Sequence, residues 1–287
     1  MPAESPRLFE CCPVGCQAPL EDTTLVVAGG RLQRCPECGQ LLSQASKTRY
    51  LERLQIWDQP RGTLPEAISA KRRDAVARRR LKTIATLLRK LPAESLLLDV
   101  GCSSGAFLQT ARQMGFPAEG IDPAPQAART AQAAGFRIYI GTLEEVQLPA
   151  ERYAAVTLFE VLEHVTHPQS IFVECRRILK PEGLLVVGTG NTDSWTVAFM
   201  QSRWEYFDME KLGGHISFFN PTSLRLLAER TGFTVERVET RNVRLVERTD
   251  VALPLYRLAK VISECLNLPA RLFGKGHDML VFIRRKS

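Results

Sequence analysis

The stretch that most constrains the fold is residues 96–108, Leu-Leu-Leu-Asp-Val-Gly-Cys-Ser-Ser-Gly-Ala-Phe-Leu. An apolar run without alternation is typical of a strand that is buried on both faces of a parallel sheet. The strand is predicted to end at Asp99 and Val100, after which Gly101 and Gly105 bracket a short loop before a helix. Such a strand–loop–helix unit predicts a doubly wound α/β fold, in which ligands bind at the carboxyl ends of the strands.

An acidic residue further along supports a nucleotide-type site in this fold. Residues 117–122 are predicted to form a second strand that ends in Asp122. Dinucleotide-binding folds place a carboxylate at this point, where it accepts hydrogen bonds from ribose hydroxyls. The first loop lacks the Gly-x-Gly-x-x-Gly spacing, which disfavours a cofactor that carries a pyrophosphate.

The segment from Asp99 to Gly105, together with Asp122, resembles the glycine-rich motif and ribose-binding acid of the class I S-adenosylmethionine-dependent methyltransferases. Ser103 stands where the commonest form of that motif has glycine. The resemblance implies a seven-stranded Rossmann-like sheet and S-adenosyl-L-methionine as cofactor. The residues that it implies for cofactor binding are Asp99, Gly101, Cys102, Ser103, Gly105, Asp122, Thr142, Leu143, Phe159 and Glu160.

Strand and helix patterns alternate along the rest of the chain. Further strands are expected at residues 136–140, 153–159, 184–188, 235–248 and 278–284, and helices at 126–134 and 171–179. Residues 160–164, Glu-Val-Leu-Glu-His, and 177–183, Arg-Ile-Leu-Lys-Pro-Glu-Gly, are similar to a methyltransferase subfamily that includes ubiquinone-biosynthesis O-methyltransferases and enzymes of glycan and secondary metabolism. This resemblance implies transfer to a small-molecule, sugar or glycan-related acceptor, at oxygen.

Two histidines are the candidate catalytic residues. His164 follows the strand at 153–159, and His215 lies in a long connection after the strand at 184–188. A hydroxyl acceptor needs a base, and histidine suits that role near neutral pH. In some relatives the Glu-x-x-Glu-His pattern binds a divalent cation, so Glu160, Glu163, His164 and His215 are a candidate Mg²⁺ set. The third alternative is that Glu163 and His164 only brace the adjoining helix.

Five of the eight cysteines lie in the first 38 residues. Cys12, Cys16, Cys35 and Cys38 form two pairs whose separation is typical of a structural four-thiolate Zn²⁺ site, with a hairpin over residues 26–34 between them. The first pair has three intervening residues, or four if Cys11 is the ligand. The alternative is a tail with free cysteines.

We therefore expect a zinc-ribbon-like module over residues 1–45 and a linker with a basic amphipathic helix over 46–92. The methyltransferase domain is expected over 93–287, with a lid insertion at 190–220 and a helical insertion at 251–275. The lid contains Trp195, Arg203, Trp204, Tyr206 and Phe207, whose alternative role is an aromatic cluster under a surface loop. The helix within 251–268 could lie on a membrane surface, cover the active site, form a homodimer contact or pack in the ordinary way.

Charge and composition restrict the remaining classes. The net charge of +7 comes from residues 64–91, which hold nine Lys/Arg against two acids. These basic side chains either form a phosphate-binding face or lie on a solvated face of the helix. We predict neither a signal peptide nor a membrane span, and a cytoplasmic location. An RNA methyltransferase is an alternative that the charge distribution does not favour. A non-catalytic scaffold protein is another, against which Gly105 and Asp122 speak.

Overall fold

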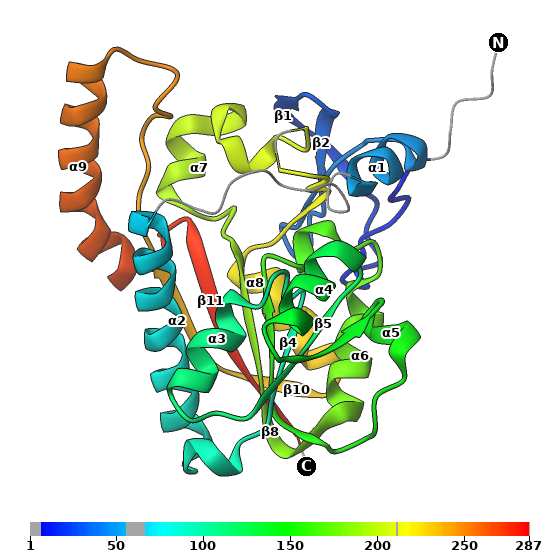
Figure 1. Cartoon of the computed structure of the whole chain (residues 1–287). Helices are drawn as coiled ribbons and strands as arrows, with labels where there is room; N and C mark the ends of the chain where they lie inside the picture. Colours follow the sequence, from blue (N-terminus) through cyan, green and yellow to red (C-terminus); the bar gives the residue numbers. More distant parts are fainter. Residues whose placement is uncertain (1–6, 56–66, 211, 287) are drawn as a thin grey trace.

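The computed structural model describes residues 7–55, 67–210 and 212–286. Within these residues the largest element is a seven-stranded sheet in the order β10-β11-β8-β7-β4-β5-β6 (Figure 1). Its strands are β4 (Leu97–Val100), β5 (Ala118–Asp122), β6 (Arg137–Ile140), β7 (Tyr153–Phe159), β8 (Leu179–Gly190), β10 (Phe233–Arg241) and β11 (Asp278–Arg285). β11 runs antiparallel to both of its neighbours, and the other pairs are parallel. The predicted doubly wound α/β fold is confirmed.

Helices cover both faces of this sheet. The helices α2 (Ala67–Leu88), α3 (Ala106–Gln113) and α4 (Pro125–Ala133) pack on one face, and α5 (Leu143–Val146), α6 (Pro168–Ile178) and α8 (Pro221–Arg230) on the other. In β8, Leu184 and Val186 belong to the core on the α2 face, whereas Leu185 and Val187 belong to the opposite core. This two-sided burial is the reason for the unbroken apolar run in the sequence.

The N-terminal part forms a second sheet above the carboxyl ends of the central strands (Figure 1). Among the described residues it has four strands in the order β1-β2-β3-β9, with bounds β1 (Glu21–Val27), β2 (Gly30–Arg34), β3 (Leu41–Leu42) and β9 (Ser217–Phe218). The antiparallel pair β1 and β2 confirms the predicted hairpin. β9 comes from the connection after β8, so the N-terminal ribbon pairs with a strand that lies about 175 residues later in the chain.

The connection at 190–220 packs onto this ribbon. It contains α7 (Trp195–Met200) and two short 3₁₀ turns, Gln201–Arg203 and Glu205–Phe207. Trp204 and Phe207 are buried with Leu25 and Leu32 of the hairpin, in a core separate from that of the main sheet. Helix α1 (Lys47–Leu54) adds Tyr50 to a neighbouring cluster. The connection thus forms a packed wall, and its role as a lid stays a prediction.

Two expected element boundaries differ in the structure. Residues 180–183, expected as a turn, lie inside β8, where the pairing with β7 shifts register between Leu179 and Leu184. The strand expected to reach residue 248 ends at Arg241, because Asn242 adopts a left-handed φ of 58°. A 3₁₀ turn (Pro92–Glu94) precedes β4, and α9 (Leu253–Leu272) lies between β10 and β11. No helix among the described residues is long and apolar enough to cross a membrane.

Candidate active site

The loop after β4 is held close to the end of β5. Gly101 and Gly105 have φ values of 75° and 84°, and a Cβ atom on Gly101 would lie 2.7 Å from the Val161 side chain. The backbone N–H of Ser103 donates to Asp122 Oδ2 at 2.7 Å, and that of Ala124 donates to Asp122 Oδ1 at 2.9 Å. The structure thus brings the predicted loop and the predicted ribose-binding acid together at the central switch point of the sheet.

Ser103 explains why glycine is common at this position of the motif. Its φ of 48° lies in the left-handed region, which costs a residue with a Cβ atom about 1 kcal/mol. The short hydrogen bond from its N–H to Asp122 offsets part of this cost. Cys102 beside it is buried, and a Cβ on Gly120 would lie 2.6 Å from its Sγ atom, so the loop and β5 are in close contact.

Asp99 lies beneath this loop and is 4% exposed. The Thr157 hydroxyl donates to Asp99 Oδ1 at 2.6 Å. Burial raises the pKa of Asp99 to about 7, although the Thr157 hydrogen bond and the positive charge of Arg80 oppose the shift. Asp99 is therefore a buried support for the loop whose charge changes near neutral pH.

Arg80 is a site residue that the sequence analysis did not identify. Its guanidinium lies 4.1 Å from the centroid of the Phe159 ring, and Glu160, Asp278 and Asp99 are the nearby charges that favour its ionised form. Burial lowers the pKa of Arg80, and its Nε is buried without a hydrogen-bond partner among the described atoms. The basic residues of α2 are predicted to lie off its apolar face, either as a phosphate-binding face or as a solvated one, because helical periodicity cannot show that the end of a long side chain turns toward the sheet.

The remaining predicted cofactor residues lie at the ends of β6 and β7. Thr142 is exposed and begins α5 with a capping box, in which its N–H donates to Glu145 Oε2 at 2.8 Å. The Leu143 side chain is instead buried in the core, so only the backbone of Leu143 borders the strand ends. Phe159 packs edge to face on Phe107 at 5.1 Å. Glu160 follows with a left-handed φ of 54°, a strain of the kind found at functional sites.

Glu163 is fully buried and held by two hydroxyl groups. Tyr206 donates to its Oε1 at 2.8 Å, and Thr189 donates to its Oε2 at 3.0 Å. The Gly190 N–H in turn donates to the Tyr206 oxygen at 2.9 Å, which fixes the phenol. Burial opposes the charge on Glu163, but the protonated forms of His164 and His215 would attract it, and the net effect lowers the Glu163 pKa from its ordinary value.

The two candidate histidines lie against each other beside Glu163. Their ring centroids are 4.6 Å apart, and His215 Nε2 lies 4.0 Å from Glu163 Oε1. Burial lowers the pKa of both imidazoles, that of His164 to about 4, so both are neutral at pH 7. His215 Nδ1 lies 2.9 Å from the Tyr206 carbonyl oxygen, to which it donates in the neutral state, and Nε2 is then left with a free electron pair.

The same residues fit a divalent cation. Ligand atoms of Glu163, His164 and His215 lie within 4.8 Å of one another. Glu160 lies outside this set, and partial desolvation together with the negative charge of Glu163 raises its pKa well above the ordinary value. Carboxylates with two neutral imidazoles match Mn²⁺ or Zn²⁺ better than Mg²⁺, which prefers oxygen ligands throughout.

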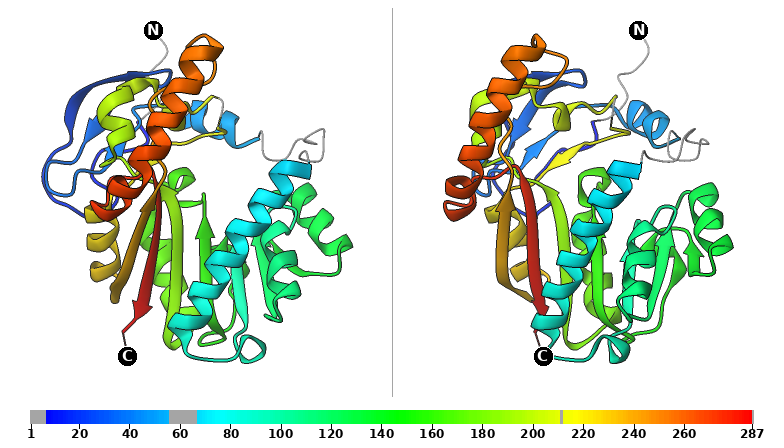
Figure 2. Two further views of the ribbon diagram at one scale, coloured as in Figure 1. Left: turned by 90° about the vertical axis from the view of Figure 1, so that its left-hand side faces the viewer. Right: turned by 60° about the vertical axis from the view of Figure 1, so that its left-hand side comes forward.

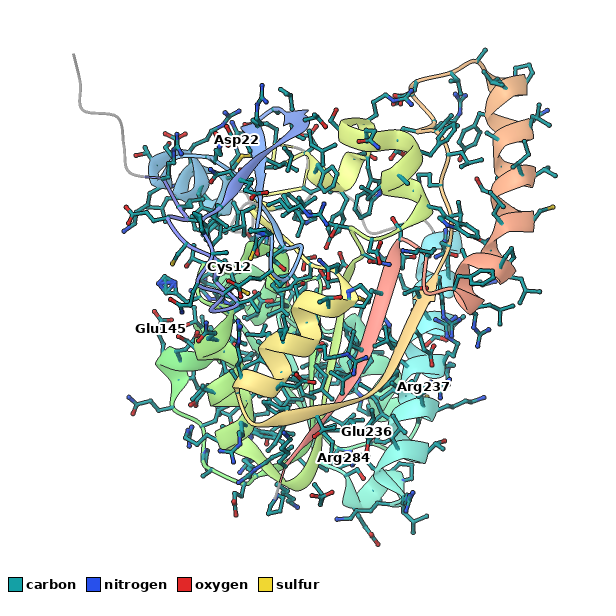
Figure 3. The ribbon with its side chains drawn as sticks, turned by 180° about the vertical axis from the view of Figure 1, so that it is seen from behind. Cys12, Asp22, Glu145, Glu236, Arg237 and Arg284 are labelled. Carbon is teal, nitrogen blue, oxygen red and sulfur yellow. The ribbon has the colours of Figure 1, made fainter. Side chains whose placement is uncertain are left out.

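The four predicted zinc ligands also come together. Cys12, Cys16, Cys35 and Cys38 are buried, and their Sγ atoms lie within 4.8 Å of one another. The Cys12 and Cys38 sulfurs are 3.6 Å apart, near the roughly 3.8 Å expected around a tetrahedral zinc with bonds of about 2.3 Å. Cys11 is exposed and lies outside the cluster, so the first pair has three intervening residues. Figure 3 labels Cys12 where the ribbon meets the helices of the main sheet.

The ribbon and the helix α1 that follows it contact the backbone of the histidine cluster. The Tyr50 hydroxyl donates to the His164 carbonyl oxygen at 2.6 Å, and Ser43 N–H donates to the Ile216 carbonyl oxygen at 2.8 Å. Ile216 N–H donates to the Glu163 carbonyl oxygen, also at 2.8 Å. On the zinc side, Asn220 Nδ2 donates to the Cys38 carbonyl oxygen at 3.0 Å. Segments far apart in the sequence thus form one wall of the site.

Comparison with known sequences agrees with this arrangement. Residues 70–238 match the family described as "Methyltransferase domain". The chain is 34% identical over 153 residues to the ubiquinone biosynthesis O-methyltransferase of Cereibacter sphaeroides, across 50% of this chain and 62% of the relative. The protein of the same description in Methylobacterium nodulans is 34% identical over 164 residues, across 51% and 63%. The chain thus spans about three fifths of the length of these curated relatives.

Solved structures share the fold. A S-adenosylmethionine-dependent methyltransferase from Archaeoglobus fulgidus superposes with a TM-score of 0.53 at 18% identity, over 82% of this chain and 99% of that one. The geranyl diphosphate C-methyltransferase from Streptomyces coelicolor, solved with Mg²⁺, geranyl diphosphate and S-adenosyl-L-homocysteine, gives 0.54 at 16% identity, over 82% and 97%. The predicted seven-stranded Rossmann-like sheet is therefore confirmed.

Proposed function

The chain belongs to the class I S-adenosylmethionine-dependent methyltransferases, and we propose that it methylates a hydroxyl oxygen of a small-molecule acceptor. The observation that carries the proposal is that two candidate halves of one site adjoin at the end of β7. The candidate cofactor residues end at Phe159 and Glu160, and the cluster of Glu163, His164 and His215 begins three residues after Glu160 in the chain, where Glu163 interacts electrostatically with Glu160. The similarity to ubiquinone biosynthesis O-methyltransferases favours oxygen as the acceptor atom.

S-adenosylmethionine bound in this site supplies an electrophilic methyl group on a sulfonium. Asp122 would accept hydrogen bonds from the ribose hydroxyls, and the 101–105 loop would contact the methionine half. Arg80 is suited to bind the carboxylate, because its guanidinium is held over Phe159 beside the end of β7 and its Nε has no partner among the described atoms. Thr142 and the backbone of Leu143 border the position of the adenine.

On the acceptor side, Glu163, His164 and His215 would hold a divalent cation, with Tyr206 and Thr189 fixing the Glu163 carboxylate. Glu160, the fourth predicted ligand, lies outside this group of converging ligand atoms. Such a cation lowers the pKa of a hydroxyl group that binds to it. The walls of the site, formed by Tyr206, His215 and the ribbon, would exclude water and orient the acceptor. If no cation binds, the neutral His215 Nε2 is the base that takes the acceptor's proton.

The cysteine cluster is suited to a structural zinc ion. Four buried thiolates leave no open coordination position for chemistry. Arg230 of α8 donates to Cys16 Sγ at 3.3 Å and to the Val14 carbonyl oxygen at 2.9 Å, which fixes the ribbon to the methyltransferase sheet. We assign residues 1–45 to the ribbon-like module, and the sheet with its 190–220 and 251–275 insertions to the catalytic part.

The test uses two ligands that differ only in the amino-acid end. S-adenosylhomocysteine carries the carboxylate, and 5′-methylthioadenosine lacks it while keeping the ribose and adenine. Isothermal titration should show that Arg80→Met weakens binding of S-adenosylhomocysteine at least about tenfold, and leaves methylthioadenosine binding unchanged. Asp122→Ala should weaken both ligands, because the ribose is common to them. Exposed Asp22 of the ribbon supplies the matched control, Asp22→Ala, which should change neither affinity.

The cation is tested by titrating zinc-loaded protein with Mn²⁺ and, separately, with Mg²⁺. We expect one site that prefers Mn²⁺ and is lost in His215→Ala, with S-adenosylhomocysteine affinity retained. Absence of a Mn²⁺ site would leave His215 as the base. Failure of the wild-type protein to bind S-adenosylhomocysteine would overturn the methyltransferase proposal itself.

A further inference from the structure

Helix α9 packs on the molecule through a narrow face of small residues. Ala259, Ser263 and Ala270 are buried, and Ala270 lies at the ends of β10 and β11, where its carbonyl oxygen accepts from Lys275 N–H at 2.7 Å. The rest of the helix extends away from the sheet (Figure 1). These contacts attach the helix to the sheet, but among the described residues most of its surface has no protein partner.

The large apolar side chains of α9 point outward. Side chains that are 44–74% exposed cover most of its length: Leu255, Leu258, Val261, Ile262, Leu268, Leu272 and the following Phe273. At 100° per residue, positions 261, 268 and 272 lie opposite Ala259 and Ala270, and positions 258 and 262 flank them on one side of the helix. A helix that covers a soluble core has its apolar arc inside. An exposed apolar stripe of this length marks an interaction surface.

Positive charge follows one edge of this apolar stripe. Within α9 the charged residues are Arg257, Lys260, Glu264 and Arg271, which share a narrow arc beside the apolar one, and Lys260 pairs with Glu264 at 4.0 Å. Beyond Arg271 the positive charge continues onto Arg79 of α2, whose pKa is lowered by burial and by the charges of Arg241, Arg80 and Arg271. Helices α9 and α2 lie on the same side of the molecule (Figure 2, left).

We propose that α9 is an interfacial helix that docks this side of the protein on an anionic lipid bilayer. Its apolar stripe would enter the boundary of the acyl chains while Arg257, Lys260 and Arg271 contact lipid phosphates. The helix lies on the membrane, since no described helix can cross one. A second copy of the chain fits less well. A two-fold contact through α9 would place three cations of each copy near those of the other with one acid, Glu264, per helix.

The test is co-sedimentation of the full chain with vesicles of two compositions. We expect binding to vesicles of equal parts phosphatidylcholine and phosphatidylglycerol, and much weaker binding to phosphatidylcholine alone. The double variant Val261→Asp/Leu268→Asp should lower the partition coefficient at least about tenfold. Its matched control is Val173→Asp on α6, because Val173 is 58% exposed and Val261 is 59% exposed. This control should bind as wild type does.

A second pair of variants tests the charge. Arg257→Gln/Lys260→Gln should weaken binding to the anionic vesicles about fivefold per removed cation, which corresponds to about 1 kcal/mol each. Arg129→Gln/Arg225→Gln removes two exposed arginines from α4 and α8 and should have no effect. Because all these side chains are exposed, circular dichroism and thermal unfolding should match wild type.

Three results would overturn the proposal. The first is no binding to the anionic vesicles. The second is equal loss of binding in Val261→Asp/Leu268→Asp and Val173→Asp, which would show that α9 is not the contact. The third is a dimer in sedimentation velocity that the α9 variant dissociates, without vesicle binding by wild type. That last result would assign the apolar stripe to a second copy of the chain.

Discussion

Tyr206→Phe separates the proposed acceptor half of the site from the cofactor half. The change deletes one oxygen atom, which donates to Glu163 Oε1 at 2.8 Å and accepts from Gly190 N–H at 2.9 Å. A hydrogen bond to a charged acceptor contributes about 1.5–3 kcal/mol, and leaving a buried N–H without an acceptor costs about 1–3 kcal/mol. Because the two effects overlap at one atom, we expect the free energy of unfolding to fall by about 3 kcal/mol.

The same oxygen fixes the carboxylate that we propose as a cation ligand. Removal of a hydrogen bond that orients a ligand weakens metal binding about tenfold to a hundredfold. Titration of zinc-loaded protein with Mn²⁺ should show this loss. The S-adenosylhomocysteine affinity should be unchanged, because the hydrogen-bond partners of the Tyr206 hydroxyl are Glu163, Gly190 and Thr189 rather than the 101–105 loop.

A matched control lies at the opposite end of the sheet. Tyr153 is fully buried and, like Tyr206, donates to a buried carboxylate, here Glu119 Oε2 at 2.7 Å. Tyr153→Phe should therefore lower the free energy of unfolding by a similar amount and leave Mn²⁺ affinity intact. Equal effects of the two variants on Mn²⁺ binding, or a loss of S-adenosylhomocysteine affinity in Tyr206→Phe alone, would refute the reasoning.

Three further predictions concern single residues. Because the pKa of Asp99 is raised to about 7 in the folded protein, its protonated form contributes stability that is fully present below about pH 4 and is lost as the pH rises through 7. Urea unfolding should show the free energy of unfolding fall by up to about 4 kcal/mol across this window, and Asp99→Asn should lack this decline. Cys38→Ser should abolish bound zinc in atomic absorption and lower the thermal midpoint, whereas exposed Cys11→Ser should change neither. Ser103→Gly should raise the free energy of unfolding by about 0.5 kcal/mol, and a decrease would mean that the left-handed φ of 48° costs nothing.

The positions of the glycine-rich loop and of Asp122 in the fold could be predicted from the sequence because their signals are local. The apolar run of β4, the glycines after it and Asp122 lie within 27 residues. Burial on both faces of the sheet requires apolar residues in β4, positive φ angles favour glycine in the loop, and ribose binding requires a carboxylate at the end of β5. The same local logic applied to the cysteine pairs, whose spacing and turn residues identified a cluster that the fold then brings together.

Contacts between distant segments could not be predicted in this way. Tyr206 lies 43 residues after Glu163 in the chain, and Arg80 lies 79 residues before Phe159, so no period or spacing connects them. Tyr206 was included only as a member of an aromatic lid. Its hydrogen bond to Glu163 depends on how the connection packs against the ribbon. Helix α9 shows a related difficulty, since an amphipathic pattern gives the width of the apolar arc but not the side of the helix that faces the protein.

The contacts of the ribbon account for its place in this chain. His215 is followed directly by Ile216 and β9, whose only strand partner among the described residues is β3 of the ribbon. The carbonyl oxygen of His164 accepts from Tyr50, and the chain around Cys38 is hydrogen-bonded to Asn220 just after β9. Loss of zinc should therefore disturb the backbone around both histidines, whereas the hydrogen bond from Ser103 to Asp122 and the pairing of β4 with β5 do not involve the ribbon. Mn²⁺ binding at the histidine cluster should thus depend on the ribbon more than S-adenosylhomocysteine binding does.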